Sequence, residues 1–167
     1  MKVYEFYGFP NSARVRIALG EKGRTDKGEF VNVNVFEGEH KTPEFLEKNL
    51  SAVVPVLELE DGMTISECAT ITEYLDDVEG EPSLTERTPK DRAIIHMMQR
   101  RAESGLLNAV MIYFHHTTPG LGPKIESDKC TESSNHQNNA LSRVCAILTV
   151  CFPTNLISQE QSFRWRT

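Results

Sequence analysis

Apolar residues in the first part of the chain follow two different periods. Val3 to Phe6 is a short apolar-rich run before a turn cluster at residues 8–12, which predicts a strand that leads into a loop. Val31, Val33 and Val35 alternate with asparagines, a pattern typical of a half-buried strand.

A helical period separates these two strands. Val15, Ala18, Leu19 and Lys22 have the spacing of one helix face, so a helix is expected from Ala13 onward. Asn11 or Ser12 is its expected N-cap, and Gly23 fits the position just past its end.

Local signals predict the next elements. Thr42-Pro43-Glu44 has a cap and a first-turn proline, so it opens a short helix. Apolar runs at 54–59 and 63–65 flank Asp61-Gly62, a strong hairpin signal, and a further helix follows Ser66 and ends near Gly80.

The predicted order over residues 1–80 is therefore βαβαββα. The alternating first elements imply a right-handed crossover and a parallel strand pair, and the hairpin adds antiparallel strands. This is the layout of an α/β thioredoxin-like domain with a mixed sheet covered by helices.

A helical second domain is expected to follow. A polar segment at 81–87 acts as a linker, and Thr88-Pro89-Lys90-Asp91 predicts a helix start for a partial all-α domain over 88–126. The stripe expected to face the core of this domain comprises Ile94, Met97, Met98, Arg101, Leu106, Ala109 and Ile112 or Tyr113.

Composition narrows the class of partner. The chain has 167 residues with 18 Lys+Arg against 24 Asp+Glu, a formal net charge of -6 that argues against nucleic acid or an anionic membrane as partner. The N-terminus lacks the apolar core of a signal peptide, so we expect a cytoplasmic protein. The spacing of its 4 cysteines fits neither a redox dithiol nor a zinc site, and no metal is expected.

Four motifs resemble those of cytosolic glutathione transferases. They occur in order over about seventy residues, and the resemblance extends to about residue 126. A further run at 113–123 resembles an atypical fungal and bacterial group of these enzymes. The four motifs are GFPNSARVRIAL at 8–19, GEHKTPEFL at 38–46, VPVL at 54–57 and ISECA at 65–69.

The resemblance implies that the glutathione thiolate is stabilised at the N-terminus of the first helix. The family's usual hydroxyl or thiol donor falls at Phe9 or Pro10, which carry neither group. Ser12 and Tyr7 are nearby candidates, although Ser12 also suits a helix cap. The small Ala13 would let the sulfur approach the helix amides, as the atypical group implies.

In that group a water held by Ser and His side chains of the long helix is implied to take the thiol proton. Tyr113, His115 and His116 are the candidates in this chain, and Met111 stands where the serine is expected.

The resemblance also implies receptors for the rest of the tripeptide. His40 and Lys41 suit the glycine carboxylate, or are a solvated pair of loop cations. Val54-Pro55 resembles the cis-proline turn that exposes the backbone of the preceding residue. Glu67 and Cys68 suit the γ-glutamyl end, with Cys68 otherwise a small packed residue.

The function implied is conjugation of glutathione, as co-substrate and without a cofactor, to a small hydrophobic electrophile. The family also implies a homodimer. Two alternatives remain open, namely an inactive truncated member or glutathione-binding module, and glutathione-dependent isomerase or peroxidase chemistry in the same pocket.

The segment 127–167 departs from the family. Codons can be chosen for residues 152–167 that, read two nucleotides downstream, give SNKPYLAGAEFSMAD, which resembles the family's capping-box region. We therefore expect a frameshift between about residues 126 and 140, and a divergent or disordered tail. A genuine divergent C-terminus or a splice variant is the alternative.

Overall fold

The computed structural model describes residues 1–79, 81, 83–85, 88–123 and 125–130. The chain divides into two units, Met1–His96 and a second that begins at Met97. The expected frameshifted tail lies almost wholly in residues 131–167, outside the described residues.

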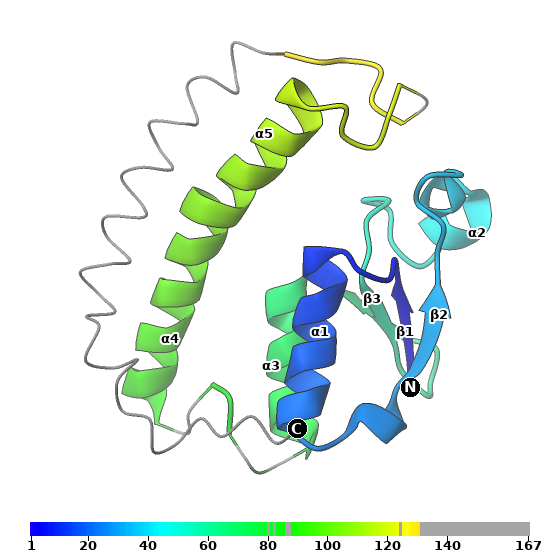
Figure 1. Ribbon diagram of the computed structural model, residues 1–167. Coiled ribbons are helices and arrows are strands. Elements are labelled where there is room, and N and C mark those ends of the chain that lie inside the picture. The colour runs from blue at the N-terminus through cyan, green and yellow to red at the C-terminus, as the bar shows by residue number, and fades with distance from the viewer. Residues whose placement is uncertain (80, 82, 86–87, 124, 131–167) are drawn as a thin grey trace. The chain divides into compact units, whose positions relative to one another are not determined.

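The first unit is built on a four-stranded sheet in the order β2-β1-β3-β4 (Figure 1). Strand β1 (Lys2–Glu5) runs parallel to β2 (Glu29–Asn32) and antiparallel to β3 (Val56–Glu58). Strand β4 (Thr64–Ser66) completes a hairpin with β3. The mixed sheet predicted from the sequence is confirmed.

Helices cover both faces of this sheet. Helices α1 (Pro10–Glu21) and α3 (Cys68–Glu79) lie side by side on one face, as Figure 1 shows. The core there consists of Val3, Val15, Leu19, Leu57, Ile71 and Leu75, each 0% exposed. Helix α2 (Pro43–Leu46) contributes Phe45 to a second cluster with Val33 and Val56. The thioredoxin-like fold is confirmed.

The first helix begins three residues earlier than predicted. Phe9 is its N-cap and Pro10 occupies the first turn, so the expectation that Asn11 or Ser12 caps the helix is wrong. The physical reason is that the proline ring fixes a helical φ and lacks the N–H that the first turn leaves unpaired. Gly23 follows the helix with φ of 62°, as predicted.

Strand β2 is shorter than the alternating valines suggest. It ends at Asn32, whereas Val33 and Val35 are buried beyond it. The N–H of Val33 donates to the carbonyl of Glu5 at 2.6 Å, so the chain stays against β1 for one more residue before it turns away.

The short elements follow their local signals. Thr42 caps α2 by accepting from the N–H of Phe45 at 3.4 Å, and Asp61-Gly62 forms the turn between β3 and β4. Two 3₁₀ turns complete the unit: η1 (Thr25–Lys27) and η2 (Glu39–Lys41).

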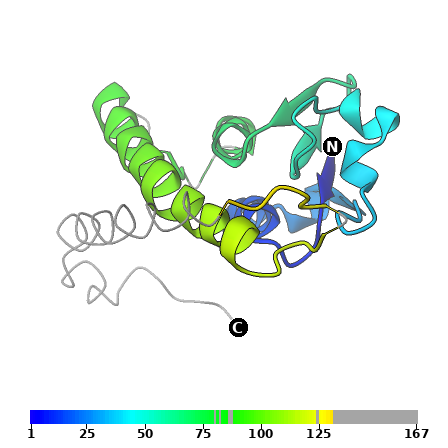
Figure 2. The ribbon, with the colours of Figure 1, turned by 90° about the horizontal axis from the view of Figure 1, so that it is seen from above.

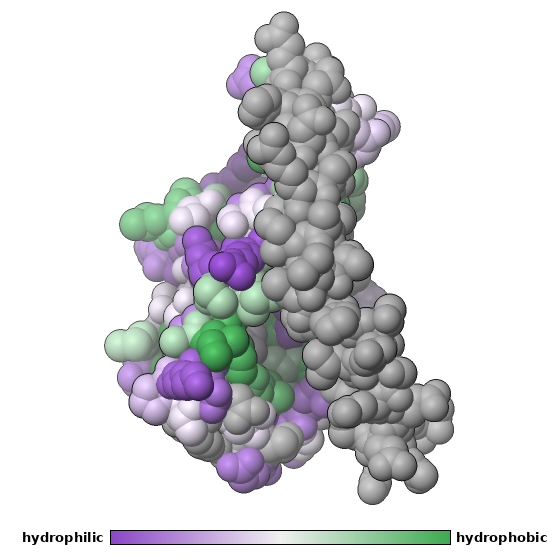
Figure 3. All heavy atoms as spheres, turned by 90° about the vertical axis from the view of Figure 1, so that its left-hand side faces the viewer, coloured by the Kyte–Doolittle hydropathy of each residue, from purple (hydrophilic) through white to green (hydrophobic). Residues whose placement is uncertain are grey.

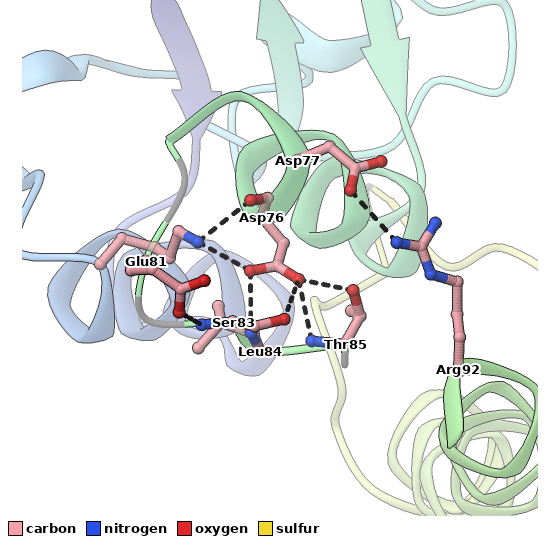
Figure 4. A network of polar contacts seen from close by, with 8 residues as sticks. Asp76, Asp77, Glu81, Ser83, Leu84, Thr85 and Arg92 are labelled. Atoms are coloured by element: carbon pink, nitrogen blue, oxygen red, sulfur yellow. Dashed lines mark hydrogen bonds and ion pairs between the residues drawn. The ribbon is translucent and has the colours of Figure 1, made fainter. Parts of the chain in front are cut away.

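Residues 83–85, which follow α3, are held to the end of that helix by hydrogen bonds. The carboxylate of Asp76 accepts from the N–H of Leu84 at 2.8 Å and from the N–H and hydroxyl of Thr85 at 2.9 and 2.5 Å (Figure 4). Lys22, at the end of α1, donates to the same carboxylate at 2.7 Å. This group of side chains, the Asp76 network, joins α1, α3 and residues 83–85.

The remaining helices are α4 (Pro89–Ala102), the π-helical turn η3 (Glu103–Leu107) and α5 (Asn108–Thr117). Residues 97–117 form a continuous helical rod (Figure 2). The predicted start of α4 is confirmed, because the N–H of Asp91 donates to Thr88 Oγ1 at 3.2 Å.

The predicted apolar stripe is only partly buried. Ala109 is 3% exposed, whereas Ile94, Met97 and Tyr113 are 46%, 43% and 47% exposed. Apolar side chains also reach the surface among polar ones in Figure 3. No helix in the described part of the chain has the length and apolar character needed to cross a membrane.

Candidate functional site

The N-terminus of α1 presents backbone amides that have no hydrogen-bond partner among the described residues. The first hydrogen bond of the helix runs from the N–H of Ala13 to the carbonyl of Phe9 at 2.9 Å. The amides of Asn11 and Ser12 precede it and therefore have no acceptor within the helix. Together with the helix dipole, these two amides favour an anion at this end.

Ser12 lies in this first turn but does not cap it. Its side chain is 1% exposed, and Oγ has no hydrogen-bond partner among the described residues. A buried hydroxyl without a partner is unfavourable, and such groups often serve a ligand or a reaction. Ala13 follows it, partly exposed and with no side chain beyond Cβ.

An aromatic cluster stands beside these amides. The rings of Phe6, Phe9 and Phe36 meet edge to face, with centroid separations of 4.5, 5.3 and 6.3 Å. Tyr7 is 72% exposed, and its ring lies 5.2 Å from the Arg16 guanidinium. The surroundings of the α1 N-terminus are thus largely apolar.

The N-terminus of α3 lies against that of α1. The Cys68 thiol, 6% exposed, donates to the carbonyl of Asn11 at 3.4 Å. The preceding Glu67 has an exposed side chain and φ of 70°, and its backbone carbonyl accepts from the N–H of Ile71 at 2.9 Å. Two helix N-termini, both able to favour anions, are thereby brought together.

The peptide bond between Val54 and Pro55 is cis, as the motif implies. Pro55 is buried, and Val54 packs against the cluster that contains Val33 and Phe45. Among the described residues, neither the N–H nor the carbonyl of Val54 enters a backbone hydrogen bond. That backbone is therefore available to pair with an extended peptide.

His40 and Lys41 lie together in η2 but differ in environment. His40 is 6% exposed and its Nδ1 has no partner among the described residues, whereas Lys41 is exposed. Burial, and to a lesser extent the Lys41 charge, lowers the pKa of His40 below its ordinary value of 6.5. The cation at this position is thus Lys41, and His40 offers neutral hydrogen-bonding groups.

The two predicted catalytic histidines lie in the second unit, at the end of α5. The ring of His115 pairs through Nδ1 with the carboxylate of Glu126, and Nδ1 of His116 accepts from the N–H of Cys130 at 3.2 Å. Tyr113, in the same helix, is 47% exposed.

Sequence reasoning did not identify Glu126 or the Asp76–Lys22 pair. Glu126 lies 11 residues from His115, and Asp76 lies 54 from Lys22. No motif spans either separation. Within the described residues there is no group of three or more potential metal ligands.

Comparison with known proteins identifies the family. The glutathione S-transferase N-terminal domain matches residues 10–78. A crystal structure of a glutathione S-transferase domain-containing protein from Marinobacter aquaeolei shares 56% identity and a TM-score of 0.86, with 89% of this chain and 73% of that chain covered. The chain belongs to the cytosolic glutathione S-transferase family.

Two curated relatives extend this result. Glutathione S-transferase 2 of Saccharomyces cerevisiae is 55% identical over 126 residues, which are 75% of this chain and 54% of the relative. Maleylacetoacetate isomerase of Pseudomonas aeruginosa is 37% identical over 93 residues, 56% of this chain and 44% of the relative. The chain thus spans about half the length of these curated relatives.

Proposed function

We propose that this glutathione S-transferase family member binds glutathione and conjugates its thiolate to small hydrophobic electrophiles. The observation that carries the proposal is the contact between Cys68 and Asn11, which unites the N-termini of α1 and α3. Glutathione carries an anionic sulfur and an anionic γ-glutamyl carboxylate, and each needs a receptor of this kind.

The thiolate is assigned to α1. A thiol with a pKa of about 8.5 is only a few per cent ionised at neutral pH, so an enzyme must favour the anion. The amides of Asn11 and Ser12 do so, the buried hydroxyl of Ser12 can donate a further bond, and Ala13 leaves space beside them.

The remaining groups hold the tripeptide. The charge of Lys41 and the neutral ring of His40 bind the glycine carboxylate. The backbone of Val54, presented by the cis bond to Pro55, pairs with the peptide as an added strand. The α3 amides bind the γ-glutamyl carboxylate.

Glu67, which is exposed beside Cys68, binds the ammonium of the γ-glutamyl group. Cys68 is a weaker donor than the serine or threonine common in the family, and its thiol is engaged by Asn11. Its part in the site is therefore to position the start of α3 against α1.

Retention on immobilised glutathione, followed by conjugation of an aryl halide, tests the proposal. Lys41→Ala is expected to raise KM for glutathione about tenfold, because a charge-assisted bond to a carboxylate is worth about 1.5–3 kcal/mol. Lys27→Ala, which removes an exposed lysine from η1, is the matched control and should leave KM unchanged. A chain that neither binds nor conjugates glutathione contradicts the proposal.

The same pocket would serve an isomerase, and one relative is named for maleylacetoacetate isomerisation. Isomerisation of a cis dienone without consumption of glutathione, in a chain that fails to conjugate aryl halides, favours that activity. Binding without any turnover favours a glutathione-binding module. A homodimer, suggested by the family alone, is tested by light scattering.

A further inference from the structure

The loop between α2 and β3 is held by a polar side chain rather than by apolar packing. Of residues 49–53, all of which the structure describes, only Asn49 is buried, with 7% of its surface exposed. Leu50 is 89% exposed and Val53 is 47% exposed. Because its apolar side chains are largely in contact with solvent, their burial contributes little to the path of this loop, called here the 49–53 loop.

Asn49 uses both ends of its side-chain amide within the loop. Its Nδ2 donates to the carbonyl of Val53 at 2.9 Å, and its Oδ1 accepts from the N–H of Ser51 at 3.1 Å. Its own carbonyl accepts from the N–H of Ala52 at 3.0 Å. Asn49 therefore binds three of the four residues that follow it.

The start of the loop is itself fixed to a helix and to the sheet. The N–H of Asn49 donates to the carbonyl of Phe45 at 3.0 Å, which continues the turn of α2. The carbonyl of Lys48 accepts from Thr64 Oγ1 in β4 at 2.9 Å, and Lys48 Nζ pairs with Glu58 in β3 at 2.6 Å. The donor that meets the Val53 carbonyl is thus held from two sides.

This hydrogen bond orients the next backbone N–H. The carbonyl of Val53 and the N–H of Val54 belong to one planar trans peptide unit, in which the two groups point in opposite directions. Since the carbonyl is directed at Asn49, the N–H of Val54 is directed away from it. That N–H has no backbone acceptor among the described residues. Asn49 therefore fixes the direction in which Val54 can donate.

The backbone of Ala52 shows that the loop does not follow its own local preference. Its φ is 53°, in the left-handed region that a residue with a Cβ seldom adopts. Glycine would adopt this conformation at no steric cost. The hydrogen bonds from Asn49 to Ser51 and Val53 flank Ala52 on both sides and hold it there.

We propose that Asn49 is a positioning residue for glutathione, because it sets the Val54 N–H to donate to the peptide backbone of the ligand. This inference rests on the proposed function, which assigns the Val54 backbone to the tripeptide. Asn49 is buried and acts through the peptide unit that joins Val53 to Val54. Its loss weakens the binding of glutathione and spares the thiolate, which is assigned to α1.

Calorimetric titration of the full chain with glutathione and steady-state conjugation of an aryl halide test the inference. Asn49→Ala removes both side-chain contacts. Asn49→Asp keeps an acceptor for the Ser51 N–H, but an ionised carboxylate cannot donate to the Val53 carbonyl. Both variants should raise Kd and KM for glutathione about tenfold and keep kcat within about twofold of the original. If Asn49→Asp keeps the original Kd, the bond to Val53 does not support binding, and the inference fails.

The split between KM and kcat separates positioning from a general effect on folding. A residue that only stabilises the fold would lower kcat through loss of active protein and leave KM of the folded fraction unchanged, a result that overturns the inference. Ser51→Ala is the matched control, because it removes an exposed hydroxyl from the same loop and keeps the N–H that Asn49 accepts. It should leave Kd unchanged.

Ala52 allows an independent change to the same loop. Ala52→Gly should keep the original Kd, because glycine adopts a φ of 53° readily. Ala52→Val should raise Kd severalfold, because a β-branched side chain disfavours this conformation more than alanine does. Equal Kd values for these two variants would contradict the dependence of binding on the path of the loop.

The hydrogen bond itself is tested on the full chain without glutathione. Nitrogen-15 NMR should show that the side-chain amide protons of Asn49 exchange slowly with solvent, and rapid exchange overturns the inference. If the unsubstituted chain binds glutathione and both Asn49 variants bind it equally well, the inference fails and the proposed function stands. If the unsubstituted chain binds no glutathione, the proposed function fails, and the exchange measurement still decides whether Asn49 holds the loop.

Discussion

Asp76 and Glu126 are both buried carboxylates, but their partners differ in kind. Asp76 is 1% exposed and meets a lysine, two backbone amides and a threonine hydroxyl. Glu126 meets a histidine and keeps one oxygen without a hydrogen bond among the described residues. The first site is saturated with donors and the second is not.

The difference separates an ion pair whose buried acceptors are satisfied from one that keeps a buried carboxylate oxygen without a hydrogen bond among the described residues. Lys22 and Asp76 are both buried and in direct contact at 2.7 Å, so the Asp76 network joins α1, α3 and residues 83–85.

The largest expected effect is the loss of the Asp76 network. Asp76→Ala leaves Lys22 buried without its counter-ion and removes the acceptor for Leu84 and Thr85, so it should cost about 3–5 kcal/mol of unfolding free energy. Urea denaturation followed by circular dichroism measures it.

Asp77→Ala is the matched control. Asp77 is the next residue of α3, its side chain is 51% exposed, and it pairs with Arg92 at 3.5 Å. An exposed pair of this kind is worth about 0–1 kcal/mol. Similar losses for Asp76→Ala and Asp77→Ala would show that the network in Figure 4 does not stabilise the fold as described.

A smaller effect on the unfolding free energy is expected at low pH. Burial acts to raise the pKa of Asp76, but the hydrogen bonds from Lys22, Thr85 and Leu84 outweigh it and hold that pKa far below its ordinary value of 3.8. Because the folded pKa is depressed, the stabilisation is complete above that ordinary value and is lost as pH falls below it. Asp76→Asn should therefore flatten the decline in stability below about pH 4. An unchanged slope contradicts this assignment.

A modest effect on stability is expected for Glu126→Ala. Removing a carboxylate that has an unpaired buried oxygen also removes a desolvation cost, so the loss should be about 1 kcal/mol. A loss as large as that of Asp76→Ala would remove the distinction between the two sites.

Local signals made most of the first unit predictable. The caps at Thr42 and Thr88 and the turn at Asp61-Gly62 depend on atoms only a few residues apart. Both partners of each interaction can therefore be recognised in one short stretch of sequence. The order of strands and helices followed from these signals and from the apolar periods.

The same reasoning failed where competing or distant groups decide the outcome. Pro10 sets the start of α1. Ser12, which the sequence suggested as a cap, therefore lies inside the helix and is buried. The partners of Asp76 and His115 come from other segments of the chain, and no local sequence pattern predicts where those segments lie. The candidate site was accessible only through the family resemblance, because its groups come from four separate segments.

The central claim is that the joined N-termini of α1 and α3, with His40, Lys41 and Val54, bind glutathione. Titration of the nitrogen-15-labelled chain with glutathione tests it most directly. The account predicts saturable chemical-shift changes for the backbone amides of Asn11, Ser12, Lys41, Val54 and Cys68. It also predicts a lower affinity for glutathione in the Lys41→Ala variant. Saturating glutathione that leaves these amides unmoved would contradict it.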